Sequence, residues 1–378
     1  MNSRPDSRAG AAPHLVVAHP RRPSAPEHEI ASHCVLAQRL AGLLGAGYAE
    51  YDPAMLAGKR VYYVPAHTLV GQAQADALGI TAEDHLYGGV VPHAYVATKA
   101  VSHPLHRAHD AQPPGWAAGL GAELGDAVLP GYTAFSLADA SAAALALLQD
   151  GPIRLKLPEA NAGRGQTVVR DAARLQAVLA GCDPADVRAH GLVIEMNLIG
   201  EVLTFSVGSV RIPGLRAAYV GTQELTPDNS GASVYGGSTL RVVRGGYDEL
   251  LNSGLSDDER QAVHLARHYD ACVQRHYPSI LASRRNYDVA LGADAQGMRR
   301  MGVLEQSWRA GGASLAEIAA LEALASDPAL HSVTAHTRER YGAGHPRPPE
   351  HALVFHAEDS TVGFISKSGG ITAYGGAK

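Results

Sequence analysis

The segment from residue 152 to residue 181 constrains the fold of this chain most. Its sequence, PIRLKLPEANAGRGQTVVRDAARLQAVLAG, predicts a strand, a glycine-containing loop, a second strand and then a helix. Asp171 is suited to cap the start of that helix, and Gly181 to end it. Lys156 lies before the loop, whereas the lysine of a P-loop follows its glycines and leads into a helix. The segment therefore predicts a hairpin lid and not a P-loop.

The loop after Lys156 nevertheless has residues that suit a phosphate-bearing ligand. Gly163 and Gly165, on either side of Arg164, let the backbone approach phosphate oxygens and present its N–H groups. Lys156 can reach the same oxygens as a point charge. The alternative is a glycine-rich surface hairpin with an unrelated lysine, since short glycine motifs often occur by chance.

The rest of the chain alternates between strand-like and helical patterns, which predicts an α/β fold. Residues 13–96 predict an open α/β layer, because strand-like segments flank a helical pattern at 27–45. Ser256 and Ser314 each open a capping box, with a glutamate three residues later. Farther along we expect a loop running into a helix at 86–105, a surface loop at 106–128, a helix at 137–150, two strands at 191–212, a helix at 256–278, a hairpin at 284–309, a helix at 314–326 and a terminal hairpin at 351–375.

Two carboxylates on the predicted hairpin at 284–309 are candidate metal ligands. Asp288 (YDVAL) and Glu305 (GVLEQSW) lie in apolar strands on its two arms. A carboxylate that faces inward from such a strand is costly unless it is paired or bound to a cation. Mg²⁺ is typically held by one or two carboxylates together with substrate phosphates. The alternatives are two solvent-facing side chains, or an ion pair with Arg285 or Arg309.

Two further charged residues lie where a strand or a hairpin ends. Glu195 ends the strand-like LVIE before a bend, so its carboxylate can accept from an amine or hydroxyl group of a ligand; an ordinary exposed glutamate is the alternative. Arg309, four residues after Glu305, can neutralise a transferring phosphate or clamp a carboxylate. The alternative for Arg309 is a salt bridge to Glu305.

The segment 221–246 is the candidate for substrate selection. It is polar and glycine-rich and contains Arg241 and Arg244, which suit an anionic substrate. A solvated hairpin is the alternative. Histidines at 103, 106 and 109 have spacings that can bind a metal, but in a chain with 19 histidines we attribute them to chance.

Length, charge and cysteine content exclude several classes of protein. A chain of 378 residues predicts two or three subdomains. The net charge of -5 gives no general attraction to nucleic acid or anionic membranes, and the apolar runs are strand-sized. Residues 1–12 lack the apolar core of a signal peptide and are expected to be disordered. The 3 scattered cysteines indicate a reduced, cytoplasmic protein.

Taken in order, these features resemble the ATP-grasp superfamily over roughly residues 90–325. LYGGVVPHAYVATK and VLEQSWRAGGAS also resemble an uncharacterised bacterial group of ATP-grasp-like proteins of unknown function. The resemblance matches the two phosphate-site lysines of the superfamily to Lys99 (YVATKAVSHPL) and Lys156, the acidic residue of its interdomain linker to Glu195, its metal carboxylates to Asp288 and Glu305, and the arginine that follows them to Arg309.

Two parts of this resemblance leave alternatives open. Ser307 stands where the superfamily has an asparagine that binds metal, and a hydroxyl is a shorter and weaker ligand than an amide carbonyl. One or two Mg²⁺ ions therefore remain open. The linker also contains Leu198 and Glu201, and either Glu195 or Glu201 can face the ribose.

The resemblance implies an ATP-grasp fold with an N-terminal open α/β domain. ATP and Mg²⁺ are the implied cofactors, and the implied reaction converts a small-molecule carboxylate to an acyl phosphate that an amine or other nucleophile attacks. No nucleic-acid or membrane partner is implied, and a homodimer is compatible with it. The implied divisions are a domain at 13–96, a nucleotide-clamping subdomain at 97–200, a second subdomain with the metal site at 201–330 and a C-terminal extension with a hairpin at 331–378.

Three other functions remain open from the sequence. Ser307 favours a non-catalytic, regulatory ATP-binding protein on the same fold. A small-molecule kinase, which leaves the phosphoryl group on its product, has the same residue requirements. A dinucleotide-binding enzyme is disfavoured, because no G-x-G-x-x-G follows the first predicted strand.

Overall fold

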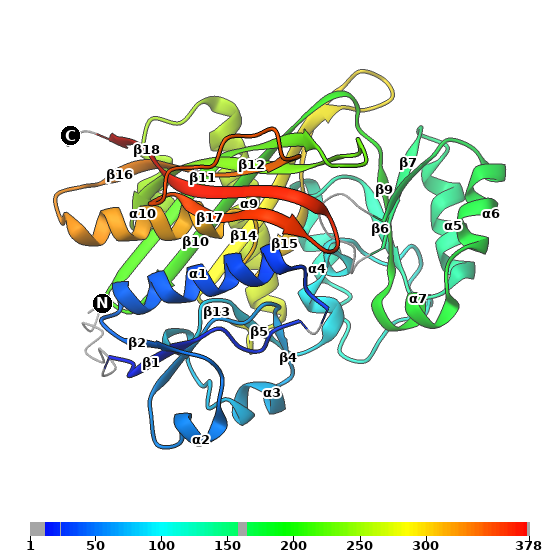
Figure 1. The fold of residues 1–378 in the computed structure, drawn as a ribbon. Helices are drawn as coiled ribbons and strands as arrows, with labels where there is room; N and C mark the ends of the chain where they lie inside the picture. Colours follow the sequence, from blue (N-terminus) through cyan, green and yellow to red (C-terminus); the bar gives the residue numbers. More distant parts are fainter. Residues whose placement is uncertain (1–11, 23, 158–164, 376–378) are drawn as a thin grey trace.

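Four β-sheets organise the part of the chain that this computed structural model describes, residues 12–22, 24–157 and 165–375. Figure 1 shows the lobe with β6–β9 at the right and the remaining sheets to its left. Helices and strands alternate along the chain as the sequence predicts, and the α/β class is confirmed.

The N-terminal layer is built on a three-stranded parallel sheet of order β2-β1-β3. A parallel pair needs a crossover connection, and α1 supplies it between β1 and β2. A second small sheet, of order β13-β5-β4, lies next along the chain. The elements of the layer are β1 (Leu15–Val17), α1 (Glu27–Leu43), β2 (Gly47–Ala49), α2 (Pro53–Leu56), β3 (Val61–Tyr63), β4 (Leu69–Val70), α3 (Gln72–Ala77), η1 (Glu83–His85) and β5 (Gly89–Val91), with β13 (Leu281–Ala282) joining from later in the chain.

The helix expected to end the segment 86–105 does not form. Two 3-10 turns take its place, and a proline accounts for the break. Pro104 restricts the residue before it to extended backbone, and His103 has φ −125° and ψ 151°. The predicted surface loop at 106–128 also contains short helices. These elements are η2 (Ala94–Ala97), η3 (Lys99–Ser102), α4 (Leu120–Leu124) and η4 (Gly125–Ala127).

The lobe at the right of Figure 1 is an antiparallel four-stranded sheet of order β6-β9-β7-β8. Its helices pack on the sheet through a core of their own. The Asp171 side chain accepts a hydrogen bond from Arg174 N at 2.7 Å, which confirms the predicted cap of α6. The elements are β6 (Gly131–Ala134), α5 (Leu137–Leu147), β7 (Ile153–Lys156), β8 (Gln166–Val169), α6 (Ala172–Ala180), α7 (Pro184–His190) and β9 (Leu192–Met196).

The largest sheet has eight antiparallel strands in the order β15-β14-β10-β11-β12-β16-β18-β17. The predicted terminal hairpin is formed by β17 and β18. Because β18 also pairs with β16, and β16 with β12, the residues after 330 enlarge this sheet and do not stand apart as an extension. The strands are β10 (Ile199–Ile212), β11 (Leu215–Pro227), β12 (Ser233–Arg244), β14 (Arg284–Ala293), β15 (Arg299–Ser307), β16 (Ser332–Tyr341), β17 (Leu353–Asp359) and β18 (Gly363–Gly375).

Helices cover both faces of the large sheet, because alternate residues of each strand are apolar on each side. On one face, α8 (Tyr247–Leu251) and α9 (Asp257–His276) pack on side chains such as Val289. On the other, α1 and α10 (Ser314–Ser326) pack on side chains such as Tyr219. Figure 1 shows α1 and α10 together on one side of the sheet. Fully burying one such apolar side chain stabilises the fold by about 1.5–3 kcal/mol.

The expected capping box of α9 is present, but that of α10 is not. In α9, the Ser256 hydroxyl accepts from Glu259 N, and the Glu259 carboxylate accepts from Ser256 N. In α10 the cap position is Ala313, and Glu317 instead forms a buried ion pair at 2.6 Å with Arg284 of β14. A buried guanidinium without a counter-charge would cost more free energy than a helix start without a capping side chain.

Candidate functional site

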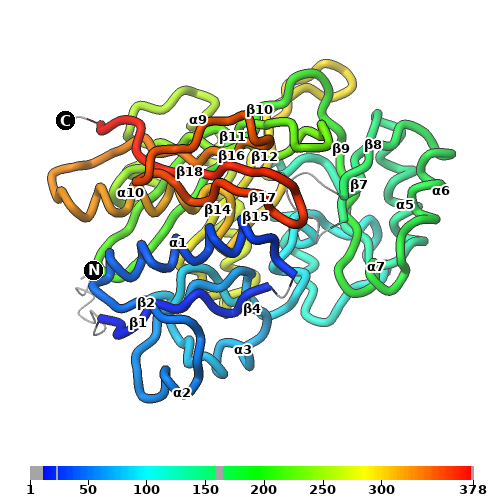
Figure 2. The backbone as a smooth tube through the Cα atoms, viewed as in Figure 1, coloured from blue at the N-terminus to red at the C-terminus, as the bar shows by residue number. Residues whose placement is uncertain are grey.

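A cavity of about 890 Å³ lies where the small lobe, the large sheet and the N-terminal layer meet. Figure 2 traces the linker from β9 of the lobe into β10 of the sheet. The cavity is lined from all three parts of the structure. Residues of β7 and of the linker form one wall, β10, β11 and β14 another, and α1 with the first residues of α10 a third.

Lys156 and Glu195 form a buried ion pair on the lobe side of the cavity. They lie on neighbouring strands, β7 and β9, of the lobe's sheet. His103 completes the cluster, with its Nε2 3.2 Å from Glu195 Oε2. Burial opposes ionisation of Glu195, but the charge of Lys156 and the contact with His103 outweigh it and lower the pKa of Glu195 to about 2. The structure thus brings two of the predicted residues together, and His103, which we attributed to a chance pattern, joins them.

Asn197, in the linker after Glu195, binds an arginine of β7 that was not among the residues predicted from the sequence. Arg154 donates to Asn197 Oδ1 at 2.9 Å and 3.2 Å, and to Gln166 Oε1 at 3.0 Å. Leu198, one of the predicted adenosine contacts, is buried and lines the cavity beside it. Alternation along β7 was a usable signal for Arg154, because a residue two positions before Lys156 faces the same side of the sheet.

Asp288 and Glu305 lie directly opposite each other on β14 and β15, and both line the cavity. The hairpin, and the placement of the two carboxylates on its neighbouring strands, were predicted from the sequence. Burial, and then the like charge of Glu305, raise the pKa of Asp288 to about 6. Asp288 Oδ1 accepts from Gln223 Nε2 at 2.8 Å and from Asn286 Nδ2 at 3.0 Å, which holds the carboxylate in place. Two carboxylates that disfavour each other's charge, held beside an open cavity, fit a divalent cation.

Three further predicted residues lie around this pair: Lys99, expected at the phosphates, Ser307, expected at the metal, and Arg309, expected at the transferring group. Lys99 is buried, and its Nζ lies 2.7 Å from Glu305 Oε2. Ser307 lines the cavity, and its hydroxyl accepts from Arg284 Nη1 at 3.4 Å. Arg309 also lines it, and burial, followed by the like charges of Arg22 and Arg284, lowers the pKa of Arg309 to about 10.

Several predicted residues lie away from the cavity. Glu201 is exposed on β10 and does not line it, so of the two linker glutamates only Glu195 faces the cavity. Gly165 has a φ of +64°, which favours glycine, whereas Gly163 and Arg164 lie outside the described residues.

Arg241 and Arg244, expected to select the substrate, are instead bound to backbone carbonyls. Arg241 Nη1 donates to the carbonyls of Ser253 and Gly254, both at 3.0 Å. Arg244 donates to carbonyls at and beyond the end of α10, those of Leu324 and Asp327 among them. Neither arginine lines the cavity, so their position does not fit the expected role in selecting the substrate. Each instead binds the backbone carbonyls of a turn or helix end beside the sheet.

The wall opposite the lobe comes from α1 and from the last strands of the sheet. His28 and His33 of α1 line it and are buried. Lys367 Nζ lies 2.8 Å from Glu339 Oε1 and 3.3 Å from His28 Nδ1. Burial, followed by the charge of Lys367, lowers the pKa of His28 to about 4. This wall was not predictable from the sequence, because its residues come from segments far apart along the chain.

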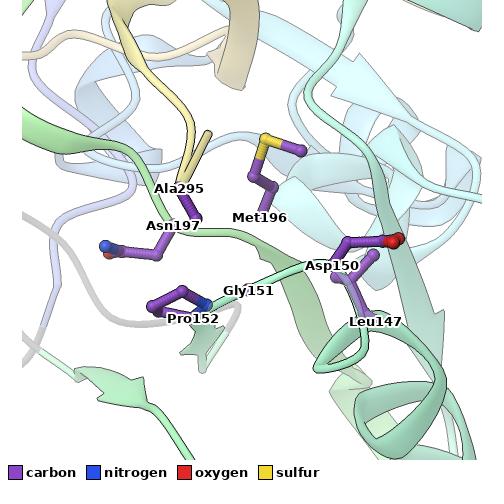
Figure 3. Close-up of a pocket in the computed structure, with 7 residues that line it drawn as sticks. All are labelled: Leu147, Asp150, Gly151, Pro152, Met196, Asn197 and Ala295. Carbon is purple, nitrogen blue, oxygen red and sulfur yellow. The ribbon is translucent and has the colours of Figure 1, made fainter. Parts of the chain in front are cut away.

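A separate pocket beside the linker is too small to hold a substrate. Figure 3 shows Met196 and Asn197 next to Pro152 and to Ala295 of the β14–β15 turn. Its volume is about 10 Å³, which is at most the space of one water molecule. The pocket marks where the turn supports the lobe, since Gln296 Nε2 donates to Asp150 O at 2.7 Å.

Comparison with known proteins gives one family and many similar folds. The family model described as "Protein of unknown function (DUF3182)" matches residues 16–369. No curated protein matches the chain. In the described part of the chain, no helix combines the length and the apolar character needed to cross a membrane.

Several solved structures share the fold at low sequence identity. Phosphoribosylamine–glycine ligase from Thermotoga maritima is 12% identical with a TM-score of 0.54, over 95% of this chain and 92% of that one. N5-carboxyaminoimidazole synthetase from Staphylococcus aureus, solved with ADP, is 10% identical with a TM-score of 0.52, over 95% and 93%. Biotin carboxylase from Campylobacter jejuni, solved as a β-γ-ATP complex, is 10% identical with a TM-score of 0.51, over 96% and 88%. These are ATP-grasp proteins, so the predicted ATP-grasp fold is confirmed.

Proposed function

Because the chain belongs to the family described as "Protein of unknown function (DUF3182)" and has the ATP-grasp fold, we propose that it is an ATP- and Mg²⁺-dependent ligase. In this proposal the protein activates a small-molecule carboxylate as an acyl phosphate, which an amine or another nucleophile then attacks. Of the three similar structures, one is a ligase, one a synthetase and one a carboxylase, and the synthetase and the carboxylase were solved with an adenine nucleotide.

The observation that carries the proposal is the arrangement of charge around one cavity. Lys156 approaches it from the lobe, and Asp288 and Glu305 from the large sheet. A triphosphate with a bound cation presents both signs of charge, so it complements basic groups on one wall and acidic groups on another. The raised pKa of Asp288 supports a cation at that carboxylate pair.

The roles of the residues follow from their positions. Lys156 would neutralise phosphate oxygens, and Glu195 with Leu198 would line the adenosine side of the cavity. Asp288 and Glu305 would hold Mg²⁺, which when bound neutralises charge on the β- and γ-phosphates. Arg309 would bind the carboxylate that attacks the γ-phosphorus as ADP leaves. Lys99 would steady Glu305, which it contacts in the structure.

The nucleophile would then displace phosphate from the acyl phosphate. In both steps the protein would contribute positioning and charge neutralisation and form no covalent bond itself. Ser307 would be a weaker metal ligand than an amide carbonyl, and its hydroxyl also accepts from Arg284 Nη1 at 3.4 Å. We therefore propose that Asp288 and Glu305 hold a single ion.

Nucleotide binding with and without Mg²⁺ tests this proposal. In Asp288→Asn, we expect magnesium-dependent affinity for a non-hydrolysable ATP analogue to fall about tenfold or more, because one of two carboxylate ligands is lost. Binding measured without Mg²⁺ should stay near the wild-type value. Asp186→Asn, an exposed residue of α7, is the matched control. Unchanged magnesium dependence in Asp288→Asn and Glu305→Gln would show that the metal site is elsewhere.

A non-catalytic nucleotide-binding protein is the second candidate. The Lys99–Glu305 and Lys156–Glu195 ion pairs favour it, because a lysine that already neutralises a carboxylate is less available to phosphate. ADP release from ATP in the presence of a pool of candidate acids and amines separates the two: a ligase releases ADP only when its acid is present, and a binding protein releases none. An acid that appears in phosphorylated form as the final product would instead indicate a kinase.

A further inference from the structure

Three polar nitrogens of the N-terminal part of the chain lack partners among the described residues, and two of them belong to side chains that line the cavity. They are Arg22 Nε, His33 Nε2 and His67 Nδ1, and each is buried. Arg22 and His33 line the cavity, and His33 is only 8% exposed. Buried donors and acceptors are almost always satisfied in folded proteins, so the unpartnered nitrogens of Arg22 and His33 are available to a group that enters the cavity.

The three residues and Arg309 form one electrostatic cluster. Arg22 and Arg309 both act on the ring of His67, and Arg22 also acts on His33 and on Arg309. The acidic groups near Arg309 are Glu305 and Asp288, which the proposed Mg²⁺ would neutralise. With that ion bound, the wall has a surplus of positive charge.

The existing contacts fix these side chains without using all of their hydrogen-bonding capacity. Arg22 forms an ion pair with Glu29 through Nη2, which leaves its Nε–H without an acceptor among the described residues. The His33 ring interacts with the backbone of Val64 and Pro65, and its Nε2 has no hydrogen-bond partner among the described residues, so the Nε2–H tautomer of the neutral ring can donate to a ligand. Side chains held by one partner while another polar atom stays unpartnered are typical of a preformed binding site.

We propose that Arg22 and His33, together with Arg309, bind an anionic group of the acid that the enzyme activates, either a carboxylate or a phosphate. The inference rests on the proposed function, because Arg309 belongs to both sites. It adds that the N-terminal layer recognises the acid, whereas the small lobe and the metal pair recognise the nucleotide. His67 does not line the cavity. Burial, followed by the charges of Arg22 and Arg309, lowers the pKa of its ring.

The site is distinct from the proposed triphosphate site because its residues come from a different part of the fold. Lys156 belongs to the lobe, and the segment with Arg22 and the helix with His33 belong to the N-terminal layer. We therefore expect separable effects. A substitution in the N-terminal layer should alter anion binding, and a substitution in the lobe should alter nucleotide binding.

The test is the thermal unfolding temperature of the full chain with inorganic phosphate or succinate, each compared with chloride at equal ionic strength. It is run with and without a saturating Mg²⁺ complex of a non-hydrolysable ATP analogue. We expect phosphate or succinate to raise the unfolding temperature of the wild type in the presence of the analogue. In Arg22→Gln the apparent affinity for the anion should fall about tenfold, because a charge-assisted hydrogen bond is lost, while analogue affinity is kept.

Two matched variants serve as controls. Arg39→Gln changes an arginine on the same helix as His33 that pairs with Glu322 and does not line the cavity, so its anion affinity should equal that of the wild type. Glu29→Gln removes the partner of Arg22 and leaves the site positive, so anion affinity should be equal or higher. His33→Leu is a second variant of the site itself, in case Arg22→Gln fails to fold.

The outcomes separate the two proposals. A larger response to phosphate identifies a phosphorylated acid, and a larger response to succinate identifies a polycarboxylic acid. Equal responses in wild type, Arg22→Gln and His33→Leu would overturn the inference, as would a wild type that responds to neither anion beyond chloride. If the analogue does not bind at all, the proposed function fails, and the measurements without analogue still decide whether the anion site exists.

Discussion

Lys156 and Glu195 depend on each other for their place inside the lobe. Both are almost completely buried, and each supplies the charge that makes the burial of the other tolerable. In Lys156→Ala we expect the free energy of unfolding to fall by about 3–5 kcal/mol, because Glu195 is left as a buried, uncompensated charge. Urea denaturation followed by circular dichroism measures this loss.

A double variant separates the structural role of Lys156 from its proposed role in binding. Lys156→Met with Glu195→Gln removes both charges together, so most of the lost stability should return. Affinity for nucleotide, measured by calorimetry, should remain low because the basic group is absent. Wild-type affinity in the double variant would contradict the role that we propose for Lys156.

His28 and His33 should make stability depend on pH. Burial is the main cause that lowers the pKa of each to about 4, whereas in the unfolded chain both titrate near 6.5. The unfolded state therefore binds more protons between these values, and stability is lost as the pH falls from about 6.5 to about 4. Each histidine contributes a slope of up to about 1.4 kcal/mol per pH unit.

Chemical denaturation at pH 7 and pH 5 checks this dependence. His28→Gln and His33→Gln should each reduce the difference between the two pH values, because one titrating group is removed. His264→Gln, at an exposed position of α9, is the control and should leave the difference unchanged. A wild type that is equally stable at both pH values would contradict the burial of the two rings.

At the scale of elements, Arg244 stabilises the end of α10. Its guanidinium donates to Leu324 O within the last turn and to Asp327 O just beyond it, where carbonyls lack partners within the helix. A cation is also favoured at this end of a helix. We expect Arg244→Ala to lower the free energy of unfolding by about 1–2 kcal/mol and to leave nucleotide and anion binding unchanged. Reduced activity with unchanged stability would restore the substrate role expected from the sequence.

Elements whose signals are local were predictable, and those set by distant contacts were not. The β14–β15 hairpin is an example of the first kind: its turn has Gly297 at φ +79°, and Asp294 Oδ1 accepts from Gln296 N and Met298 N. The start of α10 is an example of the second kind. Nothing near Glu317 in the sequence shows that it pairs with Arg284, 33 residues away.

The candidate site divides in the same way at the scale of the whole molecule. Asp288 and Glu305 could be placed on neighbouring strands from the hairpin pattern, whereas the β-bulge between Asp288 and Val289 that brings the two directly opposite each other could not be predicted. Arg22 and His33 could not, because only the tertiary fold brings the N-terminal layer to the metal pair. The resemblance to the superfamily supplied only residues that match the motifs of that superfamily, and Arg22 and His33 were not among them.

The contact between α1 and the β17–β18 turn limits when the cavity can be completed. His28 N donates to Asp359 Oδ2 at 2.9 Å, and Ser360 Oγ donates to Glu27 Oε1 at 2.7 Å. The first of these contacts joins residues 331 positions apart. During translation α1 leaves the ribosome long before the β17–β18 turn is synthesised. These two contacts of its first turn therefore cannot form until residues 359 and 360 have been added. We therefore expect nascent chains that end before residue 359 to lack this wall, even when the small lobe has already folded.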